Sequence, residues 1–101
     1  MRQPLRQPSG NFFLLPNNIF DEHLSMSEFY VYAYLVKSKD KRTHQCWPSR
    51  ATIAKNCDIK SLTTVDKALK GLDDRGMISI TPRYDLDGKG RLSSIYTVNK
   101  P

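Results

Sequence analysis

Residues 49–76 read SRATIAKNCDIKSLTTVDKALKGLDDRG, the pattern of two helices joined by a tight turn. Ser49 is a favourable N-cap residue, because its hydroxyl can accept a hydrogen bond from a free amide at the start of a helix. It predicts a short helix over residues 50–56. Residues 58–60, Asp-Ile-Lys, then predict a tight turn that brings the next helix alongside.

A longer helix follows this turn and extends to about residue 75. Ser61 or Thr63 is expected to cap its start. Gly76 is expected to end it, because glycine readily adopts the left-handed conformation that follows many helices. Apolar residues recur three or four positions apart, which places them on one face. The face predicted to be buried consists of Leu62, Val65, Leu69 and Leu72.

Beyond residue 76 the pattern changes from helical spacing to the alternation of strands. Residues 77–81 and 94–98 are rich in β-branched side chains and predict two strands. Residues 85–90 contain two glycines and predict the turn between them. The segment is therefore expected to form a β-hairpin.

A further helix is predicted upstream, over residues 26–38. Ser25 and Glu28 have the spacing of a capping box, in which each side chain accepts a hydrogen bond from the other residue's amide. This helix is apolar or aromatic nearly all round, which predicts burial on two sides. A short strand is expected near residues 45–47, and a brief strand or an extended segment over residues 12–15.

These elements predict an α+β fold, a winged helix-turn-helix with three main helices and a C-terminal β-hairpin wing. A chain of 101 residues is expected to form one domain. We place that domain at residues 12–101, after a flexible N-terminal arm over residues 1–11. A second domain is not expected.

The charge of the chain is concentrated in its middle. There are 16 Lys and Arg against 10 Asp and Glu, a net charge of +6, and residues 31–70 hold nine basic and three acidic side chains. A small basic domain favours a polyanionic partner. The apolar runs are too short to span a bilayer, and the N-terminus lacks the apolar region of a secretory signal. With only two cysteines, a cytoplasmic protein is expected.

One face of the helix that ends near residue 75 has the residues needed for a DNA contact. Thr63, Lys67 and Lys70 fall together at positions i, i+4 and i+7, with Thr64 beside them. Small residues permit close approach to base edges, and lysines reach phosphates or guanine. The candidate DNA-binding residues of this segment are Lys60, Ser61, Thr63, Thr64, Lys67 and Lys70.

Two other places are candidates for contacts with the DNA backbone. Ser49 and Arg50 begin the short helix, whose free amides attract a phosphate, although Ser49 can equally serve only as the cap. Arg83, Lys89 and Arg91 flank the tip of the hairpin, where basic residues can reach a neighbouring groove.

Metal, cofactor and enzyme sites are not expected. Residues 85–96 lack the ligands of a calcium loop, and His23, His44, Cys46 and Cys57 lack the spacing of a zinc site. No Ser, Cys or Asp is paired with His in a catalytic motif, and no glycine loop for phosphate is present.

The sequence resembles the winged helix-turn-helix proteins of Gram-positive bacteria, their phages and mobile elements, over about residues 12–98. The residues that carry the resemblance are Leu24-Ser25-x-x-Glu28, Trp47-Pro48-Ser49, Thr52-Ile53-Ala54, Lys60-Ser61-x-x-Thr64-Val65-Asp66-Lys67-Ala68-Leu69 and Leu72…Gly76-x-Ile78. That family includes N-terminal domains of replication-initiation proteins, transcription regulators, and small accessory proteins that bind the transfer origins of conjugative plasmids. Asp58 departs from its pattern, since glycine is usual there, but aspartate tolerates the left-handed conformation.

The resemblance implies binding of double-stranded DNA, commonly as a dimer. The expected site is an origin of transfer or replication, or an operator, of a mobile element; a transcriptional repressor is the alternative. An alternative of another class is a protein-interaction winged helix that acts through the aromatic first helix. Other replication or transfer proteins are candidate partners, and with no effector domain in view a stand-alone binder is expected.

A symmetric homodimer is also expected, because the chain has more apolar surface than a small domain readily covers. The first helix offers aromatic residues around its circumference, and the N-terminal apolar run adds to them. Part of that run can also fold back on the helix of its own chain. The candidate interface residues are Phe12, Phe13, Leu14, Tyr30 and Tyr34.

Overall fold

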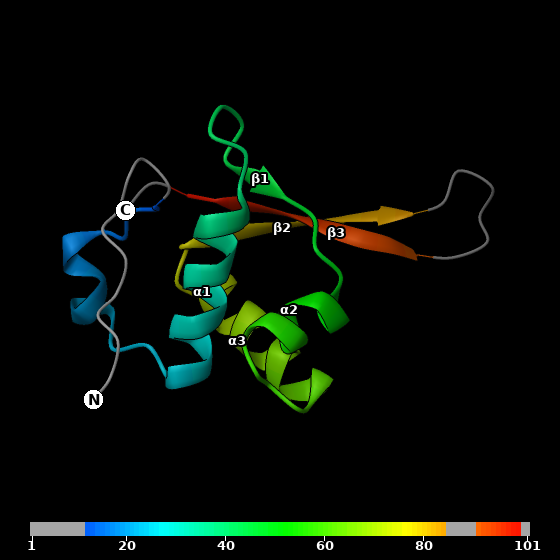
Figure 1. The fold of residues 1–101 in the computed structure, drawn as a ribbon, viewed down its shortest axis with the longest axis horizontal. Helices are drawn as coiled ribbons and strands as arrows, with labels where there is room; N and C mark the ends of the chain where they lie inside the picture. Colours follow the sequence, from blue (N-terminus) through cyan, green and yellow to red (C-terminus); the bar gives the residue numbers. More distant parts are fainter. Residues whose placement is uncertain (1–11, 85–90, 100–101) are drawn as a thin grey trace, which may run out of the picture.

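The computed structural model describes residues 12–84 and 91–99 of the chain (Figure 1). A 3-10 helix, η1 (Asn17–Glu22), precedes α1 (Met26–Ser38), and both come before the short strand β1 (Gln45–Cys46). The remaining elements are α2 (Arg50–Asn56), α3 (Leu62–Asp74), β2 (Ile78–Tyr84) and β3 (Arg91–Val98). The fold is α+β with a hairpin after three helices, as predicted. The predicted arm, residues 1–11, lies outside the described residues.

Local hydrogen bonds fix the ends of the helices. The predicted capping box begins α1, where Glu28 N donates to Ser25 Oγ at 3.1 Å and Ser25 N donates to Glu28 Oε1 at 2.8 Å. Helix α2 begins at the Ser49 cap, whose Oγ accepts from Thr52 N at 3.0 Å. Both helices have the predicted bounds.

The end of α3 confirms the role of Gly76, which has a φ of 75°. Its amide donates to Asp73 O at 2.9 Å, and Met77 N donates to Leu72 O at 3.0 Å. These two bonds form a Schellman motif, in which a left-handed residue lets the chain turn back and satisfies the last carbonyls. The chain therefore leaves α3 directly into β2.

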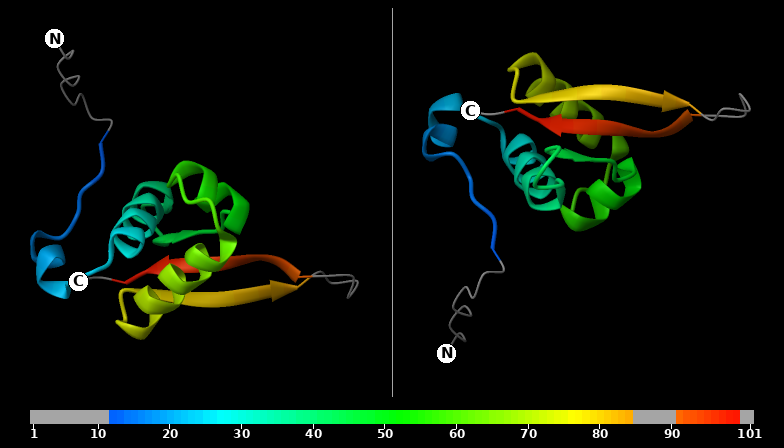
Figure 2. Two further views of the ribbon diagram at one scale, coloured as in Figure 1. Left: turned by 90° about the horizontal axis from the view of Figure 1, so that it is seen from below. Right: turned by 90° about the horizontal axis from the view of Figure 1, so that it is seen from above.

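The sheet has three antiparallel strands in the order β1-β3-β2. Ile78 pairs with Val98 and Tyr84 with Arg91, so the hairpin is longer than predicted at the end that leads to the turn. The register shifts between Thr81 and Arg83, at Pro82, which has no amide to donate to the ladder. The hairpin extends beyond the helices (Figure 1), and α3 crosses the strands when viewed from below (Figure 2, left).

The core lies where α1, α2 and α3 pack on each other and on the sheet. Its fully buried large side chains come from all three helices and from β2: Val31, Tyr32, Leu35, Ile53, Val65, Leu72 and Ile78. Within the single chain α1 is buried on one side, and burial of its second side by a partner subunit stays a prediction. Met26 is 81% exposed and Tyr30 58%, because one side of α1 packs inward and the opposite side faces solvent.

Only part of the segment before α1 packs against the core. Ile19 of η1 is buried, but Phe20 is 76% exposed and stacks on Phe29 of α1 with 5.7 Å between ring centroids. Residues 12–15 form no strand. Leu15 packs against the core, while Phe12, Phe13 and Leu14 remain exposed.

Candidate nucleic-acid interface

The turn between α2 and α3 sets the direction of α3. Asp58 has a φ of 54°, so it adopts the left-handed conformation expected at this position. Beside it, Ile59 N donates to Ala54 O at 2.8 Å and Cys57 N donates to Ile53 O at 2.9 Å. These bonds close the end of α2 and direct the chain into α3.

The start of α3 lies at Ser61, one of the two predicted caps. The Ser61 carbonyl accepts from Thr64 N at 3.1 Å and from Val65 N at 3.3 Å, but its side chain makes no capping hydrogen bond. Lys60 and Ser61 are both exposed, next to the first turn of α3.

We call Thr63, Lys67 and Lys70 the outer side of α3. All three side chains are exposed, and at 100° per residue they fall on one side of the helix. Lys70 Nζ lies 3.6 Å from Asp74 Oδ1, an exposed pair of small energetic value that leaves the ammonium accessible. Thr64, which was grouped with these residues, is half-buried instead.

The buried face of α3 consists of Val65, Ala68, Leu69 and Leu72. Leu62 was predicted to belong to it, but this side chain is 42% exposed. The correction has a simple reason: Leu62 is the first residue of α3, and the burial of α3 begins one turn later.

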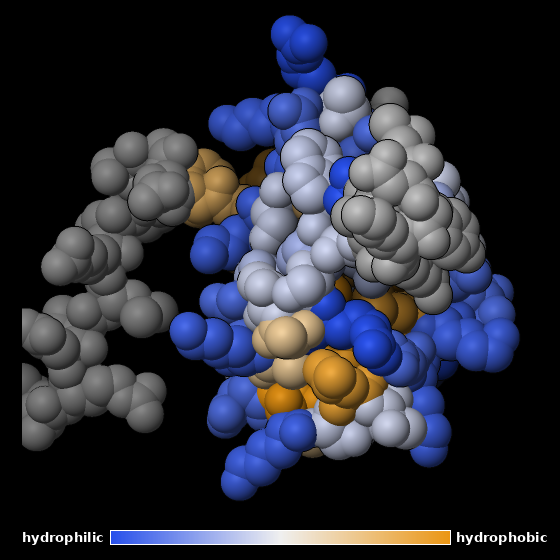
Figure 3. Space-filling model, turned by 90° about the vertical axis from the view of Figure 1, so that its right-hand side faces the viewer, coloured by the Kyte–Doolittle hydropathy of each residue, from blue (hydrophilic) through white to orange (hydrophobic). Residues whose placement is uncertain are grey.

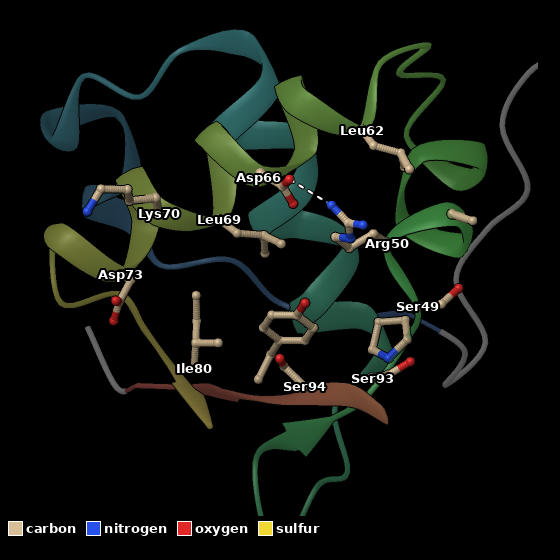
Figure 4. A pocket seen from close by; sticks show the side chains of 13 residues that line it. Ser49, Arg50, Leu62, Asp66, Leu69, Lys70, Asp73, Ile80, Ser93 and Ser94 are labelled. Atoms are coloured by element: carbon tan, nitrogen blue, oxygen red, sulfur yellow. Dashed lines mark hydrogen bonds and ion pairs between the residues drawn. The ribbon is translucent and has the colours of Figure 1, made fainter. Parts of the chain in front are cut away.

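We call Leu62, Asp66 and Asp73 the groove side of α3. They line a hollow of about 650 Å³ between α3, the start of α2 and the wing, with Ile80, Ser93 and Ser94 on the strand side (Figure 4). Seen from the side of the wing, exposed hydrophobic residues lie among hydrophilic ones (Figure 3). Sequence analysis missed this side, although the four-residue spacing of Leu62 and Asp66 was available to find it.

Both residues at the start of α2 are engaged within the protein. Ser49 donates from Oγ to Thr52 Oγ1 at 2.8 Å while it caps the helix. Arg50 Nη1 lies 2.7 Å from Asp66 Oδ2, so the first residue of α2 is tied to the second turn of α3 (Figure 4). One acceptor site of the carboxylate and one donor of the guanidinium are used by this contact.

The wing holds one of its predicted arginines in place. Arg83 is half-buried, and its Nε donates to Ser93 O of β3 at 2.7 Å. Arg91 begins β3, but its side chain lies outside the described part of the structure, and so does Lys89.

The five residues predicted for a dimer interface are not gathered in one place. Leu14 lines a hollow with Tyr32, Val36 and Val98, whereas Tyr34 is half-buried beside α2, where its hydroxyl lies 3.5 Å from Asn56 Nδ2. Tyr30 is exposed on α1, and Phe12 and Phe13 are exposed before η1.

The two cysteines are free, buried thiols. Burial raises the pKa of Cys46 to about 11 and also raises the pKa of Cys57, so both stay protonated at neutral pH. In the described ranges no three His, Cys, Asp or Glu side chains form a group that could hold a metal ion. None of the helices described has the length and apolar character needed to cross a membrane.

A comparison with protein families gives one match. Residues 22–78 match the model of a family described as a helix-turn-helix domain, more than half of the chain. The matched segment runs from the end of η1 through α3 to the first residue of β2. No curated protein and no solved structure matches the chain significantly. The match indicates DNA as the ligand, and domains of this kind are typically not enzymes.

Proposed function

Since the chain belongs to the helix-turn-helix domain family, we propose that it binds double-stranded DNA sequence-specifically, with α3 in the major groove. The observation that carries this proposal is the outer side of α3, where Thr63, Lys67 and Lys70 are all exposed along one side. The short threonine leaves room at the base edges, and the lysines reach phosphates or guanine.

Residues around α3 would extend the contact along the DNA backbone. Lys60 and Ser61 precede α3 and are exposed, so a phosphate can approach them. On the wing, the half-buried Arg83 is our candidate for a backbone contact, and the sequence adds Lys89 and Arg91. At the start of α2 we propose that the DNA is contacted by the donors of Arg50 that are not bound to Asp66, and we assign to Ser49 the role of cap. Thr64 is half-buried beside the outer side, and we keep it as a candidate DNA contact.

We propose an origin of transfer or replication, or an operator, of a mobile element as the target, with transcriptional repression as the alternative. The support is the resemblance of the motifs along residues 24–78 to proteins of that kind. Footprinting on the DNA that flanks the protein's own gene tests this. Protection next to an origin supports the first role, and protection over a promoter supports the second. The absence of any protected site, in the presence of binding to random duplexes, would contradict sequence-specific function.

We also propose that two copies pair symmetrically, which would place two α3 helices on half-sites about one helical turn apart. Phe12, Phe13 and Leu14 before η1 supply one exposed apolar surface for such a pairing, and Tyr30 of α1 supplies another, whereas Tyr34 is half-buried beside α2. Sedimentation equilibrium at micromolar concentration should give twice the chain mass of 11.6 kDa. A single 11.6 kDa species, or a target without an inverted repeat, would contradict the dimer.

A protein partner on the first helix is the second candidate function. The observation that favours it is the exposure of Met26 and Tyr30 on α1, near Phe20 of η1. The double variant Met26→Ser/Tyr30→Ser separates the two functions, because it leaves α3 untouched. Full DNA binding by this variant together with loss of a function in the cell would support the protein-interaction role. If the variant loses both the dimer and its affinity for DNA, the exposed residues Met26 and Tyr30 are assigned to self-association.

A further inference from the structure

We propose that Asp66 reads a base, by accepting a hydrogen bond from the N4 amino group of a cytosine in the major groove. Arg50 is the positioning residue that holds the Asp66 carboxylate for this contact. The inference rests on the proposed function, because it requires α3 to lie in the major groove. It adds an acidic residue to an interface that was assembled from cations and threonines.

The ion pair between Arg50 and Asp66 is the first observation. Arg50 Nη1 lies 2.7 Å from Asp66 Oδ2, and the two side chains are 52% and 50% exposed. An exposed pair of this kind contributes little to the stability of the fold, so stability is a weak reason to keep it. It does have a geometric effect, since it orients a carboxylate of α3 from a fixed point at the start of α2 (Figure 4).

The place of Asp66 on α3 is the second observation. It lies one turn after Leu62 on the groove side, and Thr63 and Lys70 of the outer side are its neighbours around the helix. Asp66 lies between these outer-side residues and the wing. When Thr63 and Lys67 face the major groove, Asp66 therefore comes close to the base edges as well. Asp66 is therefore near the bases in any arrangement in which the outer side is.

Charge decides what Asp66 can do at that place. An unpaired carboxylate near DNA is repelled by the phosphates, and the guanidinium of Arg50 offsets this repulsion. The contact with Arg50 uses Oδ2 of Asp66, and a carboxylate has about four acceptor sites. Asp66 can thus accept a hydrogen bond from DNA while it remains bound to Arg50.

Cytosine is the base whose major-groove edge suits this pair. Amino donors in the groove are N4 of cytosine and N6 of adenine, and adenine carries the acceptor N7 beside its amino group, which repels a carboxylate. The guanine paired with cytosine offers O6 and N7 as acceptors for the guanidinium donors that lie next to the carboxylate. In an A·T pair the amino group lies between two acceptors, N7 of adenine and O4 of thymine, whereas N4 of cytosine has acceptors on one side only. A carboxylate with guanidinium donors on one side therefore matches a C·G pair.

Selection of binding sites from a random duplex library tests the inference. The wild-type protein should enrich sites with one C·G pair whose replacement lowers binding about 10-fold. Asp66→Asn should lose this preference or shift it toward adenine, since an amide can pair with N6 and N7 of adenine. Arg50→Lys, which keeps the charge but not the planar guanidinium, should weaken the same preference. Asp21→Asn is the matched control, because it makes the same charge change at an exposed site of η1 and should leave the preference intact.

A duplex that carries 2-pyrimidinone in place of that cytosine tests the contact on the wild-type protein, without reliance on any variant. This base lacks the amino group, so wild-type binding should fall about 10-fold and Asp66→Asn binding should not change. If the wild-type protein enriches no site at all, the proposed function fails. If it enriches a site that Asp66→Asn recognises with the same base preferences, the inference about Asp66 is overturned and the proposed function stands.

Discussion

The two exposed sides of α3 differ in their chemistry although they belong to the same 13-residue helix. The outer side, Thr63, Lys67 and Lys70, carries positive charge and no buried contact. The groove side, Leu62, Asp66 and Asp73, carries two carboxylates and an apolar residue, and it is tied to α2 through Arg50. Contacts of lysines with phosphates give affinity for any DNA, whereas contacts with base edges give selectivity. We therefore expect the affinity of α3 for DNA and its selectivity among sequences to depend on different sides of the helix.

The largest expected effect is on the free energy of unfolding, and it tests whether Leu62 of the groove side is exposed or belongs to the core. Leu69→Ala should lower the free energy of unfolding by about 2–5 kcal/mol, because Leu69 is buried and its removal leaves a cavity. Leu62→Ala, the same change seven residues earlier, should cost less than about 1 kcal/mol. Urea denaturation measures both. Equal losses would mean that Leu62 belongs to the core and that the groove side does not exist as described.

The next effect is also on stability, and it concerns the side of α3 that faces α1. A Cβ on Gly71 would lie 2.0 Å from Glu28 Oε2. Glu28 is the partner of Ser25 in the capping box, and its Oε2 also lies 3.6 Å from Arg75 Nε. Gly71→Ala should therefore fail to give the stabilisation of about 1 kcal/mol that alanine brings to a helix. In a Glu28→Ala background, Gly71→Ala should give this stabilisation.

The coupling between these two substitutions is expected to be about 1–2 kcal/mol, from the lost cap and ion pair. A double-mutant cycle with thermal or urea unfolding measures it. Additive effects would show that α3 does not press on the capping box.

The outer side predicts a loss of affinity without a loss of selectivity. Lys67→Ala/Lys70→Ala should weaken binding to the selected site and to a random duplex alike, by about 10- to 100-fold, because phosphate contacts are the same for every sequence. Lys41→Ala/Arg42→Ala is the charge-matched control, in the loop between α1 and β1, which lies on the far side of the sheet from α3 (Figure 1). Fluorescence anisotropy with both duplexes gives the comparison. A change confined to the selected site would place base reading on the lysines instead.

The ends of the helices could be predicted from sequence because they depend on neighbouring residues. The Ser25–Glu28 box, the Ser49 cap and the left-handed Gly76 each satisfy backbone groups within a few positions, so short patterns were sufficient. The outer side of α3 followed in the same way from helical spacing.

What could not be predicted depends on how the elements meet. Helix α1 is apolar nearly all round, and only its packing on α3 and the sheet decides that Val31 and Leu35 are buried while Met26 and Tyr30 are exposed. Leu62 fits the apolar spacing of α3 but precedes the turn at which packing begins. The contact between Arg50 and Asp66 joins two helices across a turn, and spacing alone does not reveal it.

The most direct test of the central claim is the affinity of the wild-type chain for duplex DNA over a series of salt concentrations. The +6 charge within residues 31–70 and the exposed lysines of α3 predict that about four to six phosphates are neutralised per chain. A plot of log K against log salt should then be linear, with a slope of about −4 to −5. No measurable binding at low salt, or an affinity that does not change with salt, would contradict the assignment of α3 as a DNA-binding helix.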